Sequence, residues 1–119
     1  EYVRFGRTEA TVSRLGFGGA PACLGNYLEQ YDPKVEVDRQ GVIDAVLRAV
    51  ELGEHFDTAA SYGNGEGEVI FSEALSQIEN RVFLATKLPS STQDAGRSVA
   101  NNLERLRVDN LDLIQIHGW

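Results

Sequence analysis

Residues 81–117 read RVFLATKLPSSTQDAGRSVANNLERLRVDNLDLIQIH and contain one strand–helix–strand unit. The segment 81–87 is a β-rich apolar run, which is typical of a strand that is buried on both faces. Apolar residues then recur at helical spacing, at Ala95, Val99, Leu103 and Leu106. The segment 111–116 is a second apolar strand. Since strands joined through a helix form a right-handed crossover, we expect these two strands to be parallel.

The same alternation precedes this unit. A helix is predicted from Asp38, as its N-cap, to Gly53, as the residue after its C-terminus. Its apolar face consists of Val42, Ile43, Val46, Leu47 and Val50. A short strand over His55–Ala59 follows. The next helix has its apolar face at Val69, Ile70, Ala74, Leu75 and Ile78. The sequence therefore predicts repeated strand–helix units.

The first residues have a different pattern. Tyr2–Phe5 and Thr11–Leu15 flank the turn Gly6-Arg7-Thr8, which predicts a β-hairpin over residues 1–15. The apolar run Leu15–Gly19 is the first strand of the alternating part. A polar connection without periodicity follows from Ala22 to about Val37, and loops of this length in compact domains are often functional.

This order predicts an α/β fold with a parallel sheet. Residues 16–19 (GFGG) are expected to lead into a loop instead of a helix, so a dinucleotide-binding fingerprint is absent and a (β/α)8 barrel is favoured over a doubly wound sheet. Such barrels take about 250 residues. With 119 residues, the chain is expected to be the N-terminal half of one barrel domain, with its strand–helix units over residues 15–119.

Composition restricts the possible functions. The formal charge of −7 argues against binding to nucleic acid or to an anionic membrane surface. No apolar run approaches the roughly 20 residues of a membrane-spanning helix. The single Cys23 excludes an internal disulfide and indicates a reducing compartment, so a cytoplasmic protein is expected. The chain begins at Glu1 with no signal segment, which suggests processing or an incomplete chain.

Four polar side chains are predicted to meet at one rim of the barrel. Asp57, Lys87 and His117 lie where three successive strands end, and Tyr62 follows the strand of Asp57. Alone, each has a structural interpretation, as a turn residue, a solvated charge, a packed aromatic or a satisfied histidine. The carboxyl ends of parallel barrel strands converge on the active site, however, and chance would rarely place all four there.

Several motifs in the correct order resemble the aldo-keto reductase family. FDTAASYG (56–63) is similar to the family signature, in which four residues separate an Asp from a Tyr. LATK (84–87) resembles the strand that ends in the family's catalytic Lys, and NLERLRVDNLDLIQIH (102–117) resembles the signature that ends in its catalytic His. GRTEATVSRLGFGGAP (6–21) resembles the opening hairpin and first strand.

The resemblance implies reduction of aldehyde or ketone carbonyls to alcohols by a nicotinamide cofactor. Tyr62 would donate a proton to the carbonyl oxygen as negative charge develops there. A nearby ammonium stabilises a phenolate, so Lys87 would make Tyr62 a stronger acid. Asp57 would keep Lys87 charged and oriented. His117 would orient the carbonyl, with the nitrogen that bears its proton left open.

The resemblance also implies NADPH as cofactor, with NADH possible. Gly18, Gly19 and Asp57 would lie near the nicotinamide, and Trp119 would line the substrate pocket with Tyr62 and His117. The residues that grip the rest of the cofactor would belong to a missing C-terminal half of the barrel. We therefore expect residues 1–119 alone to be inactive.

Two alternatives remain open. The chain could be a non-catalytic half-barrel that assembles through the apolar edge of the strand at 111–116. It could instead be a metal-dependent barrel hydrolase, with His55, Asp57 and His117 as ligands. The second alternative is weaker because it leaves Tyr62 and Lys87 without a role.

Overall fold

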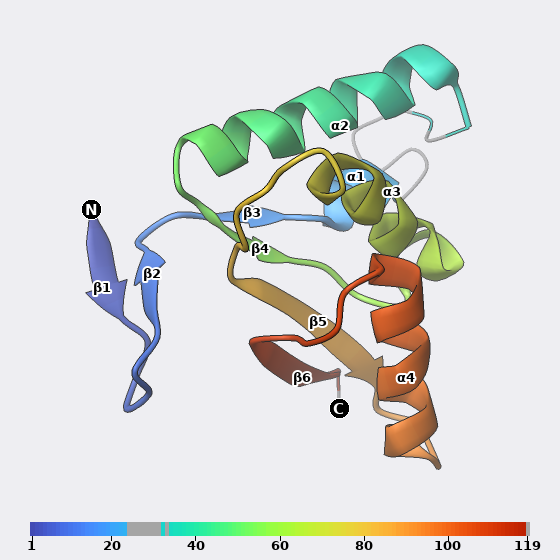
Figure 1. Ribbon diagram of the computed structural model, residues 1–119. Coiled ribbons are helices and arrows are strands. Elements are labelled where there is room, and N and C mark those ends of the chain that lie inside the picture. Colours follow the sequence, from blue (N-terminus) through green and yellow to red (C-terminus); the bar gives the residue numbers. More distant parts are fainter. Residues whose placement is uncertain (24–31, 33, 119) are drawn as a thin grey trace.

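The computed structural model describes residues 1–23, 32 and 34–118 and contains a four-stranded parallel sheet. The strands are β3 (Gly16–Gly18), β4 (His55–Asp57), β5 (Leu84–Pro89) and β6 (Leu113–His117). They lie in this order, and each pairs in parallel with its neighbour (Figure 1). The predicted parallel order is confirmed, and it brings the carboxyl ends of all these strands to one edge.

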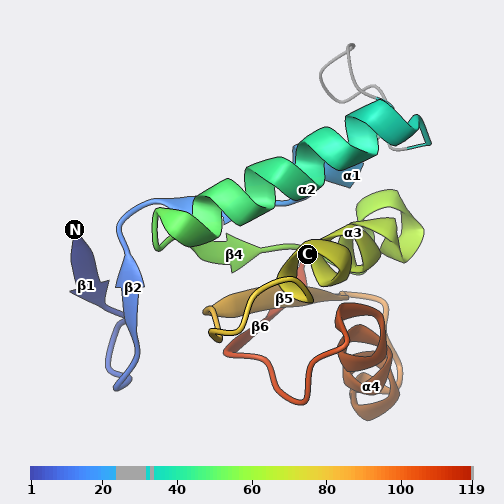
Figure 2. The same ribbon diagram turned by 45° about the horizontal axis from the view of Figure 1, so that its top comes forward.

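Three long helices follow the strands and lie along one face of the sheet (Figures 1 and 2). They are α2 (Glu36–Glu51), α3 (Glu66–Leu75) and α4 (Ala95–Leu106). The core between the helices and the sheet is apolar, and its largest fully buried side chains include Phe56, Phe71, Ile70, Val46 and Leu106. Burial of this apolar surface is the main force that holds the layers together. Within the described residues, no helix is long and apolar enough to cross a membrane.

Helix α2 begins earlier than predicted, and the prediction of Asp38 as its N-cap is wrong. Val35 occupies the N-cap position, and Asp38 lies in the first turn, where its carboxylate accepts a hydrogen bond from the Asp32 N–H (2.9 Å). Acidic residues are favoured both at the cap and throughout the first turn of a helix. An aspartate there consequently marks the region of the helix start without marking the first residue.

The end of α2 agrees with the prediction. Gly53 has a φ of 72°, and its N–H donates to the carbonyl of Val50 (2.9 Å). The next N–H, of Glu54, donates to the carbonyl of Ala49 (3.0 Å). This pair of bonds is a Schellman motif, in which the left-handed residue is usually glycine.

Several other boundaries differ from the predicted ones, among them the end of β4, which lies at Asp57 instead of Ala59. Strand β5 begins at Leu84 instead of residue 81, and β6 begins at Leu113 instead of residue 111. Asp112 explains both shifts, because its carboxylate binds Arg81 (2.6 Å) and the Leu84 N–H (2.8 Å) and thereby fixes the approach to each strand. Helix α3 ends at Leu75, so Ile78 lies outside it.

The predicted N-terminal hairpin is present as β1 (Tyr2–Arg4) and β2 (Thr11–Ser13), which pair antiparallel. It lies beyond the amino ends of the barrel-type strands (Figure 1), where the rings of Phe5 and Phe83 are 5.2 Å apart. After β3, the one-turn helix α1 (Ala20–Cys23) differs from the predicted loop. Residues 24–31 and 33 of the expected long connection lie outside the described residues.

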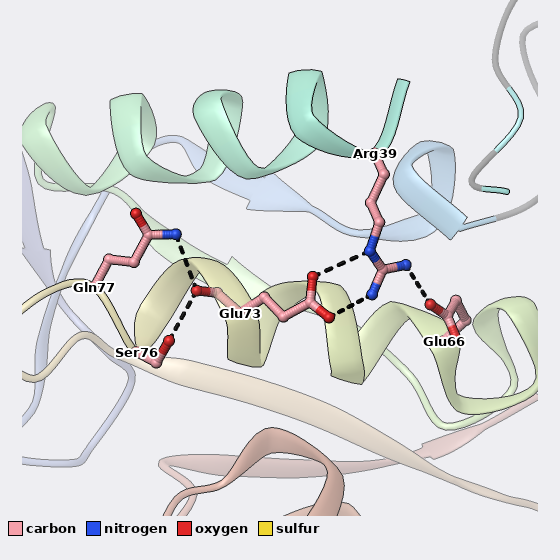
Figure 3. A network of polar contacts seen from close by, with 5 residues as sticks. All are labelled: Arg39, Glu66, Glu73, Ser76 and Gln77. Atoms are coloured by element: carbon pink, nitrogen blue, oxygen red, sulfur yellow. Dashed lines mark hydrogen bonds and ion pairs between the residues drawn. The ribbon is translucent and has the colours of Figure 1, made fainter. Parts of the chain in front are cut away.

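An ion-pair network joins α2 to α3 (Figure 3). The Arg39 guanidinium binds both oxygens of Glu73, with Nε–Oε2 and Nη2–Oε1 distances of 3.0 and 2.6 Å, and it also binds Glu66. The hydrogen bonds with Glu73 raise the pKa of Arg39 above its already high value. Two-pronged pairing of this kind fixes orientation as well as distance. It therefore holds α2 against α3, the helix that follows the loop of Tyr62.

The edge strand β6 pairs only with β5 among the described strands. Its residues alternate in exposure, and Ile114 and Ile116 are exposed on the same face. The predicted apolar edge is therefore present in the structure.

Candidate active site

The four residues predicted to meet at one rim are brought together by the carboxyl ends of the strands. Asp57 is the last residue of β4, His117 is the last residue of β6, and Tyr62 begins the short 3-10 turn η1 (Tyr62–Gly65). Lys87 is placed differently from the prediction, because β5 continues beyond it to Pro89. The extension arises because Leu88 and Pro89 remain in register with the end of β6.

Lys87 and Asp57 form an ion pair at the centre of the site. The Lys87 ammonium lies 2.5 Å from Asp57 Oδ2 and donates a second hydrogen bond to the carbonyl of Thr58 (2.8 Å). The Lys87 side chain is only 11% exposed, so its charge is removed from most of the solvent. Hydrogen bonds between charged groups are short and directional. The ammonium is consequently fixed in place, with Asp57 as its counter-ion.

Tyr62 lies close to both the ammonium and the imidazole. Lys87 Nζ is 5.2 Å from the centroid of the Tyr62 ring. The rings of Tyr62 and His117 meet edge to face, with centroids 5.5 Å apart and an interplanar angle of 89°. A phenol with an ammonium and an imidazole close to its ring can hold and move a proton.

The loop after β4 positions Tyr62 through an unusual backbone. Gly63, Asn64 and Gly65 all have positive φ values of 58°, 56° and 97°. Glycine and asparagine are the residues that adopt this region most readily, which explains the sequence GNG. The Tyr62 N–H donates to the carbonyl of Ala59 (3.1 Å), so the turn also fixes the start of the loop.

A buried network behind the site was missed by the sequence analysis. The fully buried Glu68 of α3 accepts hydrogen bonds from Thr86 Oγ1 (2.6 Å) and Arg105 Nε (2.5 Å). Thr86 immediately precedes Lys87, so the network connects α3 and α4 to the strand that carries the ammonium. The sequence signal was the position of Glu68, three residues before the buried Phe71 on the same helical face.

Ser61 was also missed as a site residue. Its hydroxyl oxygen lies 2.8 Å from Nδ1 of His117. Its position directly before Tyr62 places it in the same loop, but a serine there carries no signal of its own. It is the only hydrogen-bond partner of the His117 ring among the described residues.

The residues predicted to lie near a nicotinamide cofactor are partly consistent with that role. Gly18 pairs with Asp57 in the sheet, and a Cβ at Gly18 would meet open space. Asp57 Oδ1 is buried and has no hydrogen-bond partner among the described residues, while the Asp57 side chain as a whole is 36% exposed, so part of this residue can be reached from the solvent side of the site. At position 19, close packing explains the glycine instead, because a Cβ there would lie 3.0 Å from Thr58 Oγ1. Trp119, predicted to line the pocket, lies outside the described residues.

The alternative metal site receives no support from the side chains. In the described part of the chain, no three His, Cys, Asp or Glu residues are grouped so that they could hold a metal. His55 starts β4, at the opposite end from Asp57, and its Nδ1 lies 3.1 Å from Ser13 Oγ. His117 contacts Ser61 and Tyr62 instead.

Comparison with known proteins agrees with this geometry. The model of the aldo/keto reductase family matches residues 14–119. The NADH-specific methylglyoxal reductase of Escherichia coli is 29% identical over 97% of this chain and 41% of its own length. The aldo-keto reductase YhdN of Bacillus subtilis is 31% identical, over 98% of this chain and 38% of its own.

A crystal structure of an aldo/keto reductase from Klebsiella pneumoniae, in complex with NADP and acetate, has the same fold. It superposes with a TM-score of 0.77 at 28% identity, over 98% of this chain and 38% of that one. The chain thus spans about two fifths of the length of these relatives. The predicted (β/α)8-type fold, with four strands and a leading hairpin, is confirmed. The match over residues 14–119 shows that the chain belongs to the aldo/keto reductase family.

Proposed function

We propose that this chain supplies the catalytic residues of an oxidoreductase that reduces aldehyde or ketone carbonyls to alcohols with a nicotinamide cofactor. The observation that carries the proposal is the position of Tyr62, whose ring lies close to both the Lys87 ammonium and the His117 ring. The ion pair of Lys87 with Asp57 supports the same assignment, because it keeps a cation next to a phenol.

In the proposed reaction, Tyr62 is the proton donor. When bound, a nicotinamide cofactor would provide the hydride for the carbonyl carbon, and negative charge would then develop on the carbonyl oxygen. Tyr62 donates its phenolic proton to that oxygen, and the adjacent Lys87 ammonium stabilises the phenolate that remains. Asp57 and the Thr58 carbonyl keep the ammonium in place during this transfer. His117 donates a hydrogen bond that orients the carbonyl.

The cofactor is proposed to be NADPH, with NADH as an alternative. The partly exposed Asp57 side chain would lie beside the cofactor, and the open space beside Gly18 would admit its ring. The relatives support both dinucleotides, since one is described as NADH-specific and another was crystallised with NADP. Substrates would be small carbonyl compounds that contact Tyr62 and His117, with Trp119 proposed as a further wall.

The proposal assigns residues 15–119 to the first four strand–helix units of one barrel domain. In this assignment, further strands hold most of the cofactor, since few of the described residues are available to grip a dinucleotide. Residues 1–119 by themselves are therefore expected to show no turnover.

The test is an assay of carbonyl reduction with the product of the complete reading frame. Purified protein is mixed with NADPH or NADH and a panel of small aldehydes and ketones, and loss of the reduced cofactor is followed with formation of the alcohol. Residues 1–119 alone are the matched comparison. Alcohol formation that requires the complete product supports the proposal, and absence of turnover across the panel with both cofactors would sink it.

A further inference from the structure

The chain contains two histidines, and each has its Nδ1 next to a serine hydroxyl. Ser13 Oγ lies 3.1 Å from Nδ1 of His55, and Ser61 Oγ lies 2.8 Å from Nδ1 of His117. A neutral imidazole carries one proton, and the hydrogen bond at one nitrogen decides which nitrogen bears it. Whether each serine donates or accepts at Nδ1 is therefore coupled to the tautomer of the ring that it contacts.

At His55, the hydroxyl of Ser13 can only accept a hydrogen bond from the imidazole. The Ser13 hydroxyl donates to the carbonyl of Leu15 (2.5 Å), and its oxygen also accepts from the backbone N–H of His55 (3.0 Å). A hydroxyl has a single proton, which is already used in the bond to Leu15. His55 must consequently donate to Ser13, so its proton lies on Nδ1.

At His117, the hydroxyl of Ser61 is able to donate a hydrogen bond to Nδ1 of the imidazole. Among the residues that the structure describes, the Ser61 hydroxyl has no other hydrogen-bond partner. The turn holds Ser61 in place, since its carbonyl accepts from the Asn64 N–H (3.3 Å). Donation from Ser61 makes Nδ1 the acceptor and leaves the imidazole proton on Nε2.

This tautomer is the one that the chemistry requires. The ring of His117 meets the ring of Tyr62, the proposed proton donor, so a carbonyl oxygen that receives the Tyr62 proton would lie near the imidazole. A protonated Nε2 donates a hydrogen bond to that oxygen, whereas an unprotonated Nε2 would present a lone pair to it. We propose that Ser61 is a positioning residue that donates to Nδ1 of His117 and thereby makes Nε2 a hydrogen-bond donor toward the substrate carbonyl, an inference that rests on the proposed function.

The tautomers can be measured without catalysis. The protein is labelled with 15N-histidine, and long-range 1H–15N correlations are recorded at about pH 8.5, above the usual range of imidazole protonation. The expected spectrum has opposite tautomers, with the proton on Nε2 in His117 and on Nδ1 in His55. Residue assignment comes from His55→Gln and His117→Gln, each of which removes the signals of its own ring.

Variants of Ser61 then test whether its hydroxyl, and not another neighbour, sets the tautomer of His117. Ser61→Ala should move the His117 ring signals toward a mixture of tautomers and leave those of His55 unchanged. Ser61→Thr keeps the hydroxyl and should restore the parent pattern. A proton on Nδ1 of His117 in the parent protein overturns the proposal without any variant. Parent-like His117 signals in Ser61→Ala also overturn it.

Kinetics of the complete product test the consequence for the reaction. Ser61→Ala should lower kcat/KM for the carbonyl by about two- to tenfold, the value of one hydrogen bond, while Ser61→Thr restores it. Full activity in Ser61→Ala together with altered ring signals would refute the positioning role. If the parent protein reduces no carbonyl while its spectrum is as expected, the proposed function fails and the tautomer assignment stands.

Discussion

Replacement of Glu68 by methionine is expected to destabilise the protein strongly, although Glu68 contacts no proposed substrate. Methionine keeps the length of the side chain and removes its charge and both acceptor oxygens. The change leaves the hydroxyl of the buried Thr86 and the guanidinium of Arg105 without their carboxylate partner. Unpaired buried groups are costly because they have already lost their contact with water.

The expected loss of unfolding free energy in Glu68→Met follows from the burial of Thr86 and Arg105. Removal of one member of a buried ion pair typically costs about 3–5 kcal/mol. Arg105 is 30% exposed, so it regains part of its hydration, while Thr86 is fully buried and does not. We therefore expect a loss of about 2–4 kcal/mol, near the lower end of that range. Glu68→Gln, which can still bond both partners, should lose less.

The assay is urea unfolding followed by far-UV circular dichroism, with the free energy of unfolding obtained by linear extrapolation. The matched control is Glu51→Gln, which breaks the exposed pair with Arg48, whose side chains are both 66% exposed. An exposed pair is worth at most about 1 kcal/mol, so this variant should stay close to the parent. Equal stability of Glu68→Met and Glu51→Gln would show that the buried Glu68 pair contributes no more than an exposed one.

Two further predictions concern the helices. Gly53→Ala should cost about 1–2 kcal/mol because Gly53 has a φ of 72°, whereas Gly41→Ala, inside α2 and with no atom near its new Cβ, should stabilise by about 0.5–1 kcal/mol. Urea unfolding of both variants checks this, and a change in unfolding free energy of the same sign in both would contradict it. Arg39→Lys should cost about 1 kcal/mol because an ammonium cannot bind both Glu73 oxygens as the guanidinium does. Thermal unfolding measures this change, and an unaltered Tm would show that the network does not hold α2.

The order of strands and helices could be predicted because it depends on local patterns. The face Ala95, Val99, Leu103 and Leu106 has the spacing of a helix, and α4 spans exactly that interval in the structure, from Ala95 to Leu106. Gly53 could be assigned because a left-handed residue after a helix is usually glycine. Boundaries such as the start of β5 were missed because they depend on Asp112, a residue 28 positions away from Leu84.

For the candidate site, the sequence could identify the residues but only part of their contacts. Asp57, Tyr62, Lys87 and His117 could be named because parallel strands bring their ends together. The contacts of Ser61 and Glu68 could not, since each depends on a partner brought close only by folding. For Glu68, the helical spacing from Phe71 indicates the buried face, but the sequence does not identify Thr86 and Arg105 as its partners.

The proposed reaction depends on Tyr62, beside Lys87, as the proton donor in carbonyl reduction. The most direct test compares the complete product with its Tyr62→Phe variant, which keeps the ring and removes the hydroxyl. We predict that kcat falls by about a hundredfold or more, as expected for loss of a general acid, while cofactor binding measured by fluorescence titration is unchanged. A Tyr62→Phe protein that reduces carbonyls at the parent rate would contradict the account.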